Sequence, residues 1–178
     1  MILSDSEILK EIEKGNIVIT PFKQECLGSN SYDVHLGSTL AMYSNHILDA
    51  KQHNKINYFE IPEDGYLMLP DKLYLGVTKE YTETFNHVPI LEGKSSTGRL
   101  GITIHITAGL GDVNFKGNWV LEITVVQPII VYASMPIGQL VYHTVKGEVL
   151  NPYDTKKSAK YSNQPNIPVE SMMWKNKF

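Results

Sequence analysis

The order of apolar and polar positions predicts one helix at the start of the chain. Ile8, Leu9 and Ile12 share one face at helical spacing. A Ser-x-x-Glu capping box begins at Ser4, and Gly15 stands where a helix would stop. We therefore expect a short N-terminal helix that packs its apolar face on the rest of the protein.

Beyond this helix the pattern changes to short apolar runs separated by Pro, Gly and Asp residues. The nine runs lie at residues 17–19, 32–36, 39–43, 66–69, 73–77, 101–107, 119–126, 129–132 and 139–145. Many short strands with regular turns are typical of an antiparallel sandwich, jelly roll or barrel. The sequence thus predicts a mainly β protein, with residues 1–178 as one domain.

The last part of the chain, residues 148–178, has a different composition, rich in Asn, Lys, Ser, Tyr and Pro. Tails of this kind are usually disordered. This one carries heavy hydrophobic side chains at Tyr153, Tyr161 and Met172–Trp174. We therefore expect a C-terminal tail that docks as a lid rather than hanging free.

Composition excludes several classes of protein. The single Cys26 rules out a disulfide framework within the chain and suits a reducing cytoplasm. The acidic, amphipathic N-terminus is no signal peptide, and no apolar run approaches the roughly 20 residues that cross a bilayer. A net charge of -3 argues against a general nucleic-acid binder. We expect a cytoplasmic protein without nucleic-acid or membrane partners.

The candidate chemistry lies between Gly93 and Glu122. A glycine-rich turn there carries three hydroxyl residues, Ser95–Thr97, between two cations that suit phosphate oxygens, Lys94 and Arg99. A Walker loop is excluded because Val88 occupies the position of its first glycine. From composition alone, an ordinary hairpin turn with polar side chains stays open as the alternative.

Glu122 is the second feature of this region, because it interrupts an apolar run from Trp119 to Val125. An unpaired ionised group would be costly in such surroundings. The carboxylate is therefore either paired with Lys or Arg in a structural role or kept reactive by its environment.

Zinc-dependent deamination is excluded by the residues present. Such enzymes need a His-x-Glu segment and a Pro-Cys-x-x-Cys segment, and this chain has one cysteine and no His followed two positions later by Glu. The six histidines are scattered without ligand spacing, and Ser95 follows no nucleophile-elbow pattern. We expect no zinc site, and a structural role for His105.

Ordered motifs along nearly the whole chain resemble the dCTP deaminase family, the deaminating branch of the trimeric dUTPase superfamily. The matching segments are MILSDSEIL at 1–9, SNSYDVHLG at 29–37, EGKSSTGRLG at 92–101, TAGLGDVNFKG at 107–117, LE at 121–122, MPIGQL at 135–140, and PY, AKY and NQ in the tail. The resemblance implies a distorted, jelly-roll-like β-barrel of the dUTPase type. It also implies a homotrimer with active sites between subunits, and a hydrolase that acts on the cyclic amidine C–N bond of dCTP.

The resemblance implies a catalytic group without a protein-bound metal. Glu122 would be the general acid/base, taking a proton from the water that attacks C4 of cytosine and passing protons to N3 and the leaving ammonia. Ser95 and the carbonyl of Ala108 would orient that water, and Arg99 would hold Glu122 and Ser95 in register.

The remaining implied contacts surround the nucleotide. They are Lys94, Ser96, Thr97 and Gly98 in the phosphate turn, Asp112 at the deoxyribose, the main chain of Val120 and Leu121 at the base, and Gln139, Tyr153, Lys160 and Gln164 around the triphosphate. Mg²⁺ would bind through the substrate triphosphate, and dTTP is expected as a feedback inhibitor. Asp33 resembles a superfamily carboxylate, for which we expect a structural role.

The product stays open at this point. Our expectation is hydrolytic deamination of dCTP to dUTP and ammonia, as a step of dUTP biosynthesis. The alternative is a bifunctional enzyme that continues to dUMP and pyrophosphate. Gly111 and Val113–Asn114 depart from the residues that many relatives carry, and Lys94 stands where Arg is common. A pure dUTPase is disfavoured by Glu122 and the tail motifs, and a non-catalytic nucleotide sensor by the intact Ser95, Arg99 and Glu122.

Overall fold

The N-terminal helix α1 (Asp5–Glu13) forms where the sequence predicts it in the computed structural model, which describes residues 1–178. The Ser4 hydroxyl caps it by accepting a hydrogen bond from the Glu7 N–H at 3.4 Å. Gly15 ends it in the left-handed region, with φ of 74°. No helix is both long and apolar enough to cross a bilayer.

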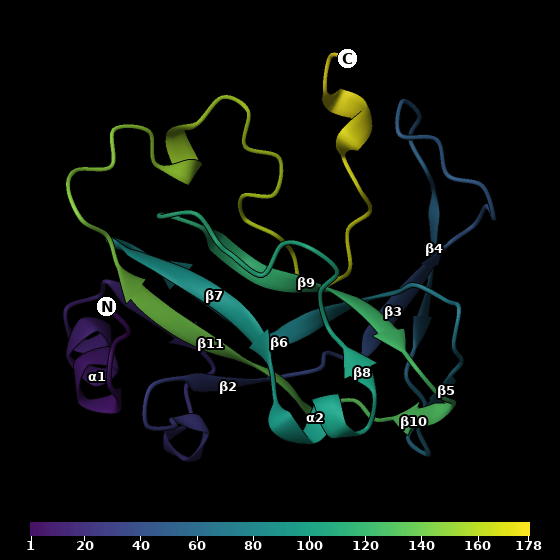
Figure 1. Cartoon of the computed structure of the whole chain (residues 1–178), viewed down its shortest axis with the longest axis horizontal. Helices are drawn as coiled ribbons and strands as arrows, with labels where there is room; N and C mark the ends of the chain where they lie inside the picture. The colour runs from purple at the N-terminus through teal and green to yellow at the C-terminus, as the bar shows by residue number, and fades with distance from the viewer.

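Strands make up most of the remaining structure, which confirms the mainly β prediction (Figure 1). They are β1 (Ile17–Thr20), β2 (Tyr32–His35), β3 (Thr39–Tyr43), β4 (Ile56–Glu60), β5 (Tyr66–Met68), β6 (Tyr74–Thr84), β7 (His87–Gly93), β8 (Ile102–Thr103), β9 (Lys116–Val125), β10 (Ile129–Val131) and β11 (Pro136–Thr144). The short helix α2 (Ser95–Arg99) and the 3-10 turns η1 (Gln24–Cys26), η2 (Tyr153–Thr155) and η3 (Met173–Lys175) complete the order. Each of the nine predicted apolar runs contains a strand.

Two strands lie outside the predicted runs. β4 has no buried residue, and its sequence shows no apolar run that would have predicted a strand. β7 contains Pro89, which argues against a strand in the sequence. The structure tolerates this proline because β7 is the edge strand of its sheet. On its outer side, the Pro89 carbonyl accepts a hydrogen bond from the Gly111 N–H at 2.8 Å.

Two other segments differ from expectation. The predicted run at 101–107 forms only the two-residue strand β8, and residues 104–107 leave the ladder as a loop beside β9. The predicted turn after Gly93 is the helix α2, whose first turn is closed by hydrogen bonds between Thr97 Oγ1 and the main chain of Lys94.

The strands form three antiparallel sheets rather than one closed barrel. The largest has the order β4-β3-β6-β9-β8, with β1 also paired to β6. A second contains β2-β11-β7, and a third contains β10-β5. Because no continuous ladder joins the three sheets, the expected barrel is open in the single chain.

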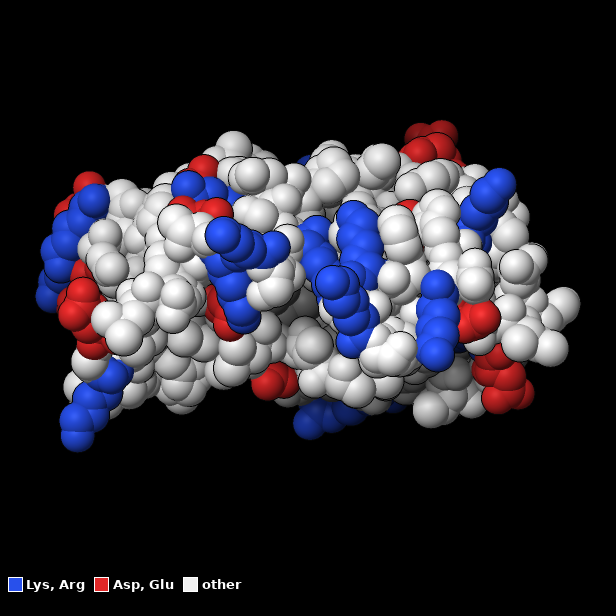
Figure 2. Space-filling model, turned by 90° about the horizontal axis from the view of Figure 1, so that it is seen from above, with Lys and Arg blue, Asp and Glu red and all other residues white.

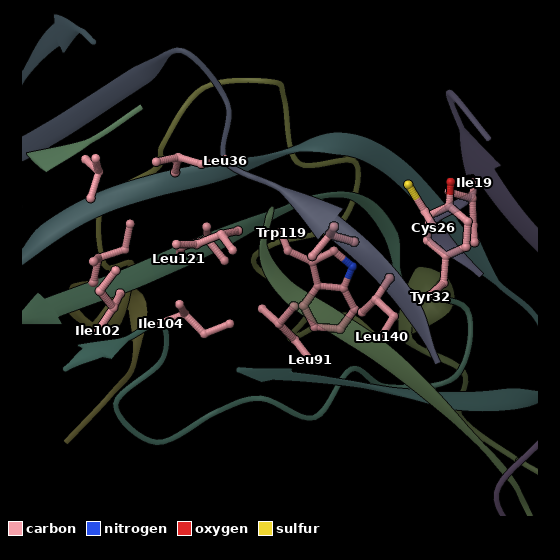
Figure 3. Close-up of a cluster of buried hydrophobic side chains, with 14 of the residues drawn as sticks. Ile19, Cys26, Tyr32, Leu36, Leu91, Ile102, Ile104, Trp119, Leu121 and Leu140 are labelled. Carbon is pink, nitrogen blue, oxygen red and sulfur yellow. The ribbon is translucent and has the colours of Figure 1, made fainter. Parts of the chain in front are cut away.

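The core lies between the two larger sheets and sets the orientation of β9. Figure 3 shows Trp119 and Leu121 of β9 beside Leu91 and Leu140 in this core. Leu121 and Ile123 are fully buried, and burial of each such side chain stabilises the fold by about 1.5–3 kcal/mol. The alternation of a strand therefore turns Glu122 to the opposite face.

The C-terminal tail lies along β9 (Figure 1). The Asn163 N–H donates to the Lys116 carbonyl at 2.8 Å, and the Asn118 N–H donates to the Gln164 carbonyl at 3.1 Å. Gly117 permits this approach, because a Cβ there would lie 2.4 Å from the Gln164 nitrogen. The tail thus docks on the strand that carries Glu122.

Candidate active site

A cavity of about 480 Å³ lies between β9, the loop at 106–112 and the C-terminal tail. Its size falls within the range of small-molecule sites. Figure 2 shows basic side chains around a hollow in the upper face, where Figure 1 places the tail. The cavity is lined by these predicted site residues: Ala108, Asp112, Val120, Glu122, Tyr153 and Gln164.

Glu122 is half-buried at the cavity wall and is positioned by main-chain groups. Its own N–H donates to the Ile104 carbonyl at 2.9 Å, and its Oε2 accepts a hydrogen bond from the Ile106 N–H at 2.8 Å. It forms no ion pair within the chain, so the structural pairing left open by the sequence is absent here. The carboxylate is therefore oriented by the main chain and faces the cavity.

The loop at 106–112 approaches its neighbours so closely that two glycines are required. A Cβ at Gly109 would lie 2.5 Å from the Leu91 carbonyl oxygen, and one at Gly111 would lie 2.6 Å from Cη2 of Trp119. The Trp119 indole therefore explains why glycine occupies position 111. The same loop brings Ala108 to the cavity that contains Glu122.

Aromatic and amide groups of the tail form the facing wall. The Tyr153 hydroxyl accepts a hydrogen bond from the Tyr161 N–H at 3.0 Å, and the Tyr153 ring lies 6.2 Å from that of Phe115. The buried Oε1 of Gln164 has no hydrogen-bond partner in the chain. A buried polar atom without a partner is costly, so this amide is available to a bound ligand.

The predicted phosphate residues lie elsewhere. Lys94, Ser95, Ser96 and Gln139 surround a second hollow of about 260 Å³. Lys94 forms an ion pair with Asp33, which gives Asp33 a structural partner. No residue lines both hollows, so a single chain does not bring Ser95 to Glu122.

Arg99 also does not line the cavity that contains Glu122. It is exposed on α2 and forms no ion pair. Thr97 is buried and its hydroxyl is used inside the turn, while Gly98 is exposed beside it. The Gln139 amide donates to the Gly93 carbonyl at 3.1 Å.

Two further predicted residues lie outside the cavity. The side chain of Leu121 is fully buried in the core on the opposite face of β9. The Lys160 ammonium donates to the Asn176 amide oxygen instead of lining the cavity. Their predicted contacts with a nucleotide therefore stay predictions.

The sequence did not identify the cavity residues contributed by β3 and the chain end. Tyr43 and Leu48 line the cavity together with Glu170 and Ser171. Burial raises the pKa of the Tyr43 hydroxyl, and the nearby charges of Glu170 and Glu122 act in the same direction. No periodic pattern or motif marks these positions, because they meet only through the tertiary fold.

The chain is similar to known proteins of one family. Residues 2–145 match the family described as dCTP deaminase-like. The protein "dCTP deaminase, dUMP-forming" of Clostridium beijerinckii is 51% identical over 176 residues, covering 99% of this chain and 98% of the relative. Proteins of the same name from Clostridium acetobutylicum (47%, with 99% and 98% covered) and Leptospira biflexa (48%, with 94% and 95% covered) are also similar.

A solved structure shares the fold at lower identity. The 2'-deoxycytidine 5'-triphosphate deaminase of Agrobacterium tumefaciens matches with a TM-score of 0.63 and 17% sequence identity. The match covers 84% of this chain and 50% of that chain, so the chain spans about half the length of the solved protein.

These relatives correct our expectation of an enzyme that stops at dUTP. They are named dUMP-forming, so the expectation of dUTP release, and with it of a role in dUTP biosynthesis, is wrong. The sequence could not decide this because both outcomes begin with the same deamination. The family match covers residues 2–145, and about half of all positions are identical to those of relatives aligned over nearly the whole chain. The chain therefore belongs to the dCTP deaminase-like family.

Proposed function

We propose that the protein is a bifunctional enzyme that deaminates dCTP and then releases dUMP and pyrophosphate. One observation carries the proposal: an unpaired carboxylate, Glu122, lines a cavity of nucleotide-compatible size and is oriented by the Ile106 N–H. The relatives named dUMP-forming support the choice of product.

Deamination needs a group that accepts and returns protons at one place. Glu122 takes a proton from water as its oxygen adds to C4 of cytosine, and N3 becomes protonated. Glu122 then carries the proton of the new C4 hydroxyl to the amino group, the C4–N bond breaks as the C4=O bond forms, and ammonia leaves dUTP behind. The Ala108 carbonyl, which shares the cavity with Glu122, is available to orient the water.

The second step is hydrolysis at the phosphate nearest the sugar. A water molecule attacks the α-phosphorus of dUTP, the bond to the bridging oxygen breaks, and pyrophosphate leaves dUMP. Such a step depends on cations that neutralise the phosphate oxygens. Lys156 lies 3.9 Å from Asp112 at the cavity, and Figure 2 shows several basic side chains on this face.

Magnesium belongs to this proposal as a companion of the nucleotide. No three His, Cys, Asp or Glu side chains come together as metal ligands in the chain. Mg²⁺ commonly uses one or two carboxylates together with substrate phosphates, so this donor set is compatible with an ion carried by the triphosphate. When bound, the ion would offset phosphate charge, while Glu122 would act on the base.

We further propose a homotrimer whose active sites combine residues of two subunits. The separation of Ser95 and Arg99 from Glu122 within one chain supports it, because the reaction needs these groups together. Exposed apolar side chains after α2, in the loop at 106–112 and after β9 offer a surface that a second subunit would cover. They are Leu100, Ile106, Leu110 and Val126.

Inhibition by dTTP is the regulatory part of the proposal. The dTTP molecule carries the same triphosphate on a pyrimidine deoxynucleoside, so the same cavity would accept it. Its base has a 4-oxo group and therefore no amine to remove. Rates with dCTP at several dTTP concentrations test this, and rates unaffected by dTTP would contradict it.

Product chromatography tests the proposed reaction. Labelled dCTP with Mg²⁺ should give labelled dUMP, pyrophosphate and ammonia. Addition of unlabelled dUTP shows whether the intermediate stays on the enzyme, in which case labelled dUTP does not accumulate. Labelled dUTP as the only nucleotide product would contradict the bifunctional proposal, and the absence of ammonia would contradict deamination.

A further inference from the structure

The chain end, residues 169–178, lies against the β3–β4 arm, residues 43–55. The Ser171 N–H donates to the Tyr43 hydroxyl at 3.0 Å. The Lys51 ammonium lies 5.5 Å from the centre of the Phe178 ring. These contacts join segments more than 100 residues apart, and no catalytic step proposed above uses them.

His53 is at the centre of this contact. Its Nε2 lies 2.6 Å from Oε1 of Glu170, and its ring lies 5.6 Å from the ring of Trp174. Burial acts to raise the pKa of Glu170, but the hydrogen bond from His53, a main-chain hydrogen bond and the charge of Lys175 together hold it below its usual value. Glu170 is therefore held ionised against the imidazole.

The two segments also form one side of the cavity. Tyr43 and Leu48 of the β3–β4 arm line it, as do Glu170 and Ser171 of the chain end. Separation of the two segments would open this side to water. An open site would weaken each charged contact with a bound nucleotide, because water screens it.

We propose that His53 is a positioning residue that latches the chain end to the β3–β4 arm through Glu170 and so encloses the nucleotide cavity. This inference rests on the proposed function for its effect on dCTP, but the latch itself does not. His53 does not line the cavity, so it acts through Glu170, which does.

Fluorescence tests the latch without any turnover. Trp174 is 39% exposed and Trp119 only 6%, so acrylamide quenching reports mainly on Trp174. His53→Ala and Glu170→Gln should each increase the quenching of the nucleotide-free protein. His46→Ala is the matched control, because His46 is exposed in the same arm and forms no hydrogen bond or ion pair there. Quenching unchanged in both latch variants would overturn the proposal.

Kinetics test the effect on the cavity. With dCTP and Mg²⁺, His53→Ala should raise KM up to about fivefold, the size expected for one partly exposed hydrogen bond to a carboxylate, while kcat stays close to that of the parent. The double variant with Glu170→Gln should show no further rise, because both changes break one contact. His53→Lys, which keeps a nitrogen donor toward Glu170, should restore part of the loss.

Independent, additive effects of the two substitutions, or a lower kcat with an unchanged KM, would overturn the positioning role. The two proposals fail separately. A parent protein that does not convert dCTP contradicts the proposed function, whereas the quenching experiment still decides whether the latch exists.

Discussion

At the scale of single residues, the surroundings of Glu122 differ from those of a structural carboxylate. Its contacts are main-chain groups of Ile104 and Ile106, and no cation of the same chain neutralises it. A paired carboxylate would resist changes of protonation state, whereas this one faces a cavity. This placement supports the proton-transfer role that we propose for Glu122.

Glu122→Gln should lower the rate of ammonia release from dCTP by about 10²–10⁴-fold. Glutamine can still accept the Ile106 N–H bond but cannot shuttle a proton, so the loss should fall on kcat. Dissociation constants for dCTP and the melting temperature should stay near those of the parent. The control is Glu63→Gln, an exposed turn residue. Turnover within a few-fold of the parent would remove Glu122 from the reaction.

At the scale of elements, buried polar contacts attach α1 to the strands. Glu11, 6% exposed, accepts hydrogen bonds from Lys14 at 2.6 Å and Asn16 at 2.8 Å, and its Oε2 lies 2.9 Å from Nε2 of His87 on β7. These contacts, led by that of Lys14, lower the pKa of Glu11 from 4.5 to about 2. The ionised carboxylate therefore fastens the helix to the sheet.

Acid should weaken this attachment in a defined window. A carboxyl whose pKa is lower in the folded protein contributes stability that is fully present above pH 4.5 and lost as pH falls toward about 2. Urea unfolding of the parent between pH 2 and 7 should show this loss. In Glu11→Gln, which cannot titrate, the free energy of unfolding should be lower at pH 7 and depend less on pH. Identical pH profiles for both proteins would contradict the assignment.

The tail is the second element with a separable role. Its hydrogen bonds with β9 are few, while its side chains form a whole wall of the cavity. A chain that ends after Val149 should therefore keep the β fold, yet convert dCTP at a severely reduced rate. Circular dichroism and product formation measure the two effects. Normal turnover by the truncated protein would show that the tail does not enclose the substrate.

At the scale of the whole molecule, the site residues form two separate groups. Glu122 and Ala108 line one hollow, whereas Ser95 lines the other and Arg99 is exposed nearby on α2. Within one chain, no residue lines both hollows. Assembly of identical chains offers the direct route to a complete site.

Mixing two inactive variants tests such shared sites. Glu122→Gln and Arg99→Ala should each be inactive alone, but trimers formed from both should regain part of the activity, because some interfaces combine an intact Glu122 with an intact Arg99. The proteins are mixed after mild dissociation, and their mass is measured by light scattering. A trimeric mixture without recovered activity, or an active monomer, would contradict the shared site.

The sequence by itself determined the local features of this protein. The short apolar runs, the Ser4 cap and the turn formers depend on neighbouring residues, so the N-terminal helix and nine of the strands could be predicted. Glu122 could be selected because a charged residue inside an apolar strand is conspicuous without any structure. The resemblance to a family added the roles but did not fix the product.

Only the tertiary structure decided which of these features meet. Residues 104–107 were predicted as strand, but they form a loop in which the Ile106 N–H donates to the Glu122 carboxylate. His53 reaches Glu170 across 117 positions of the chain, a contact that no local pattern encodes. Short-range periodicity reports which face of an element is buried, whereas the partners of that face depend on how the sheets pack.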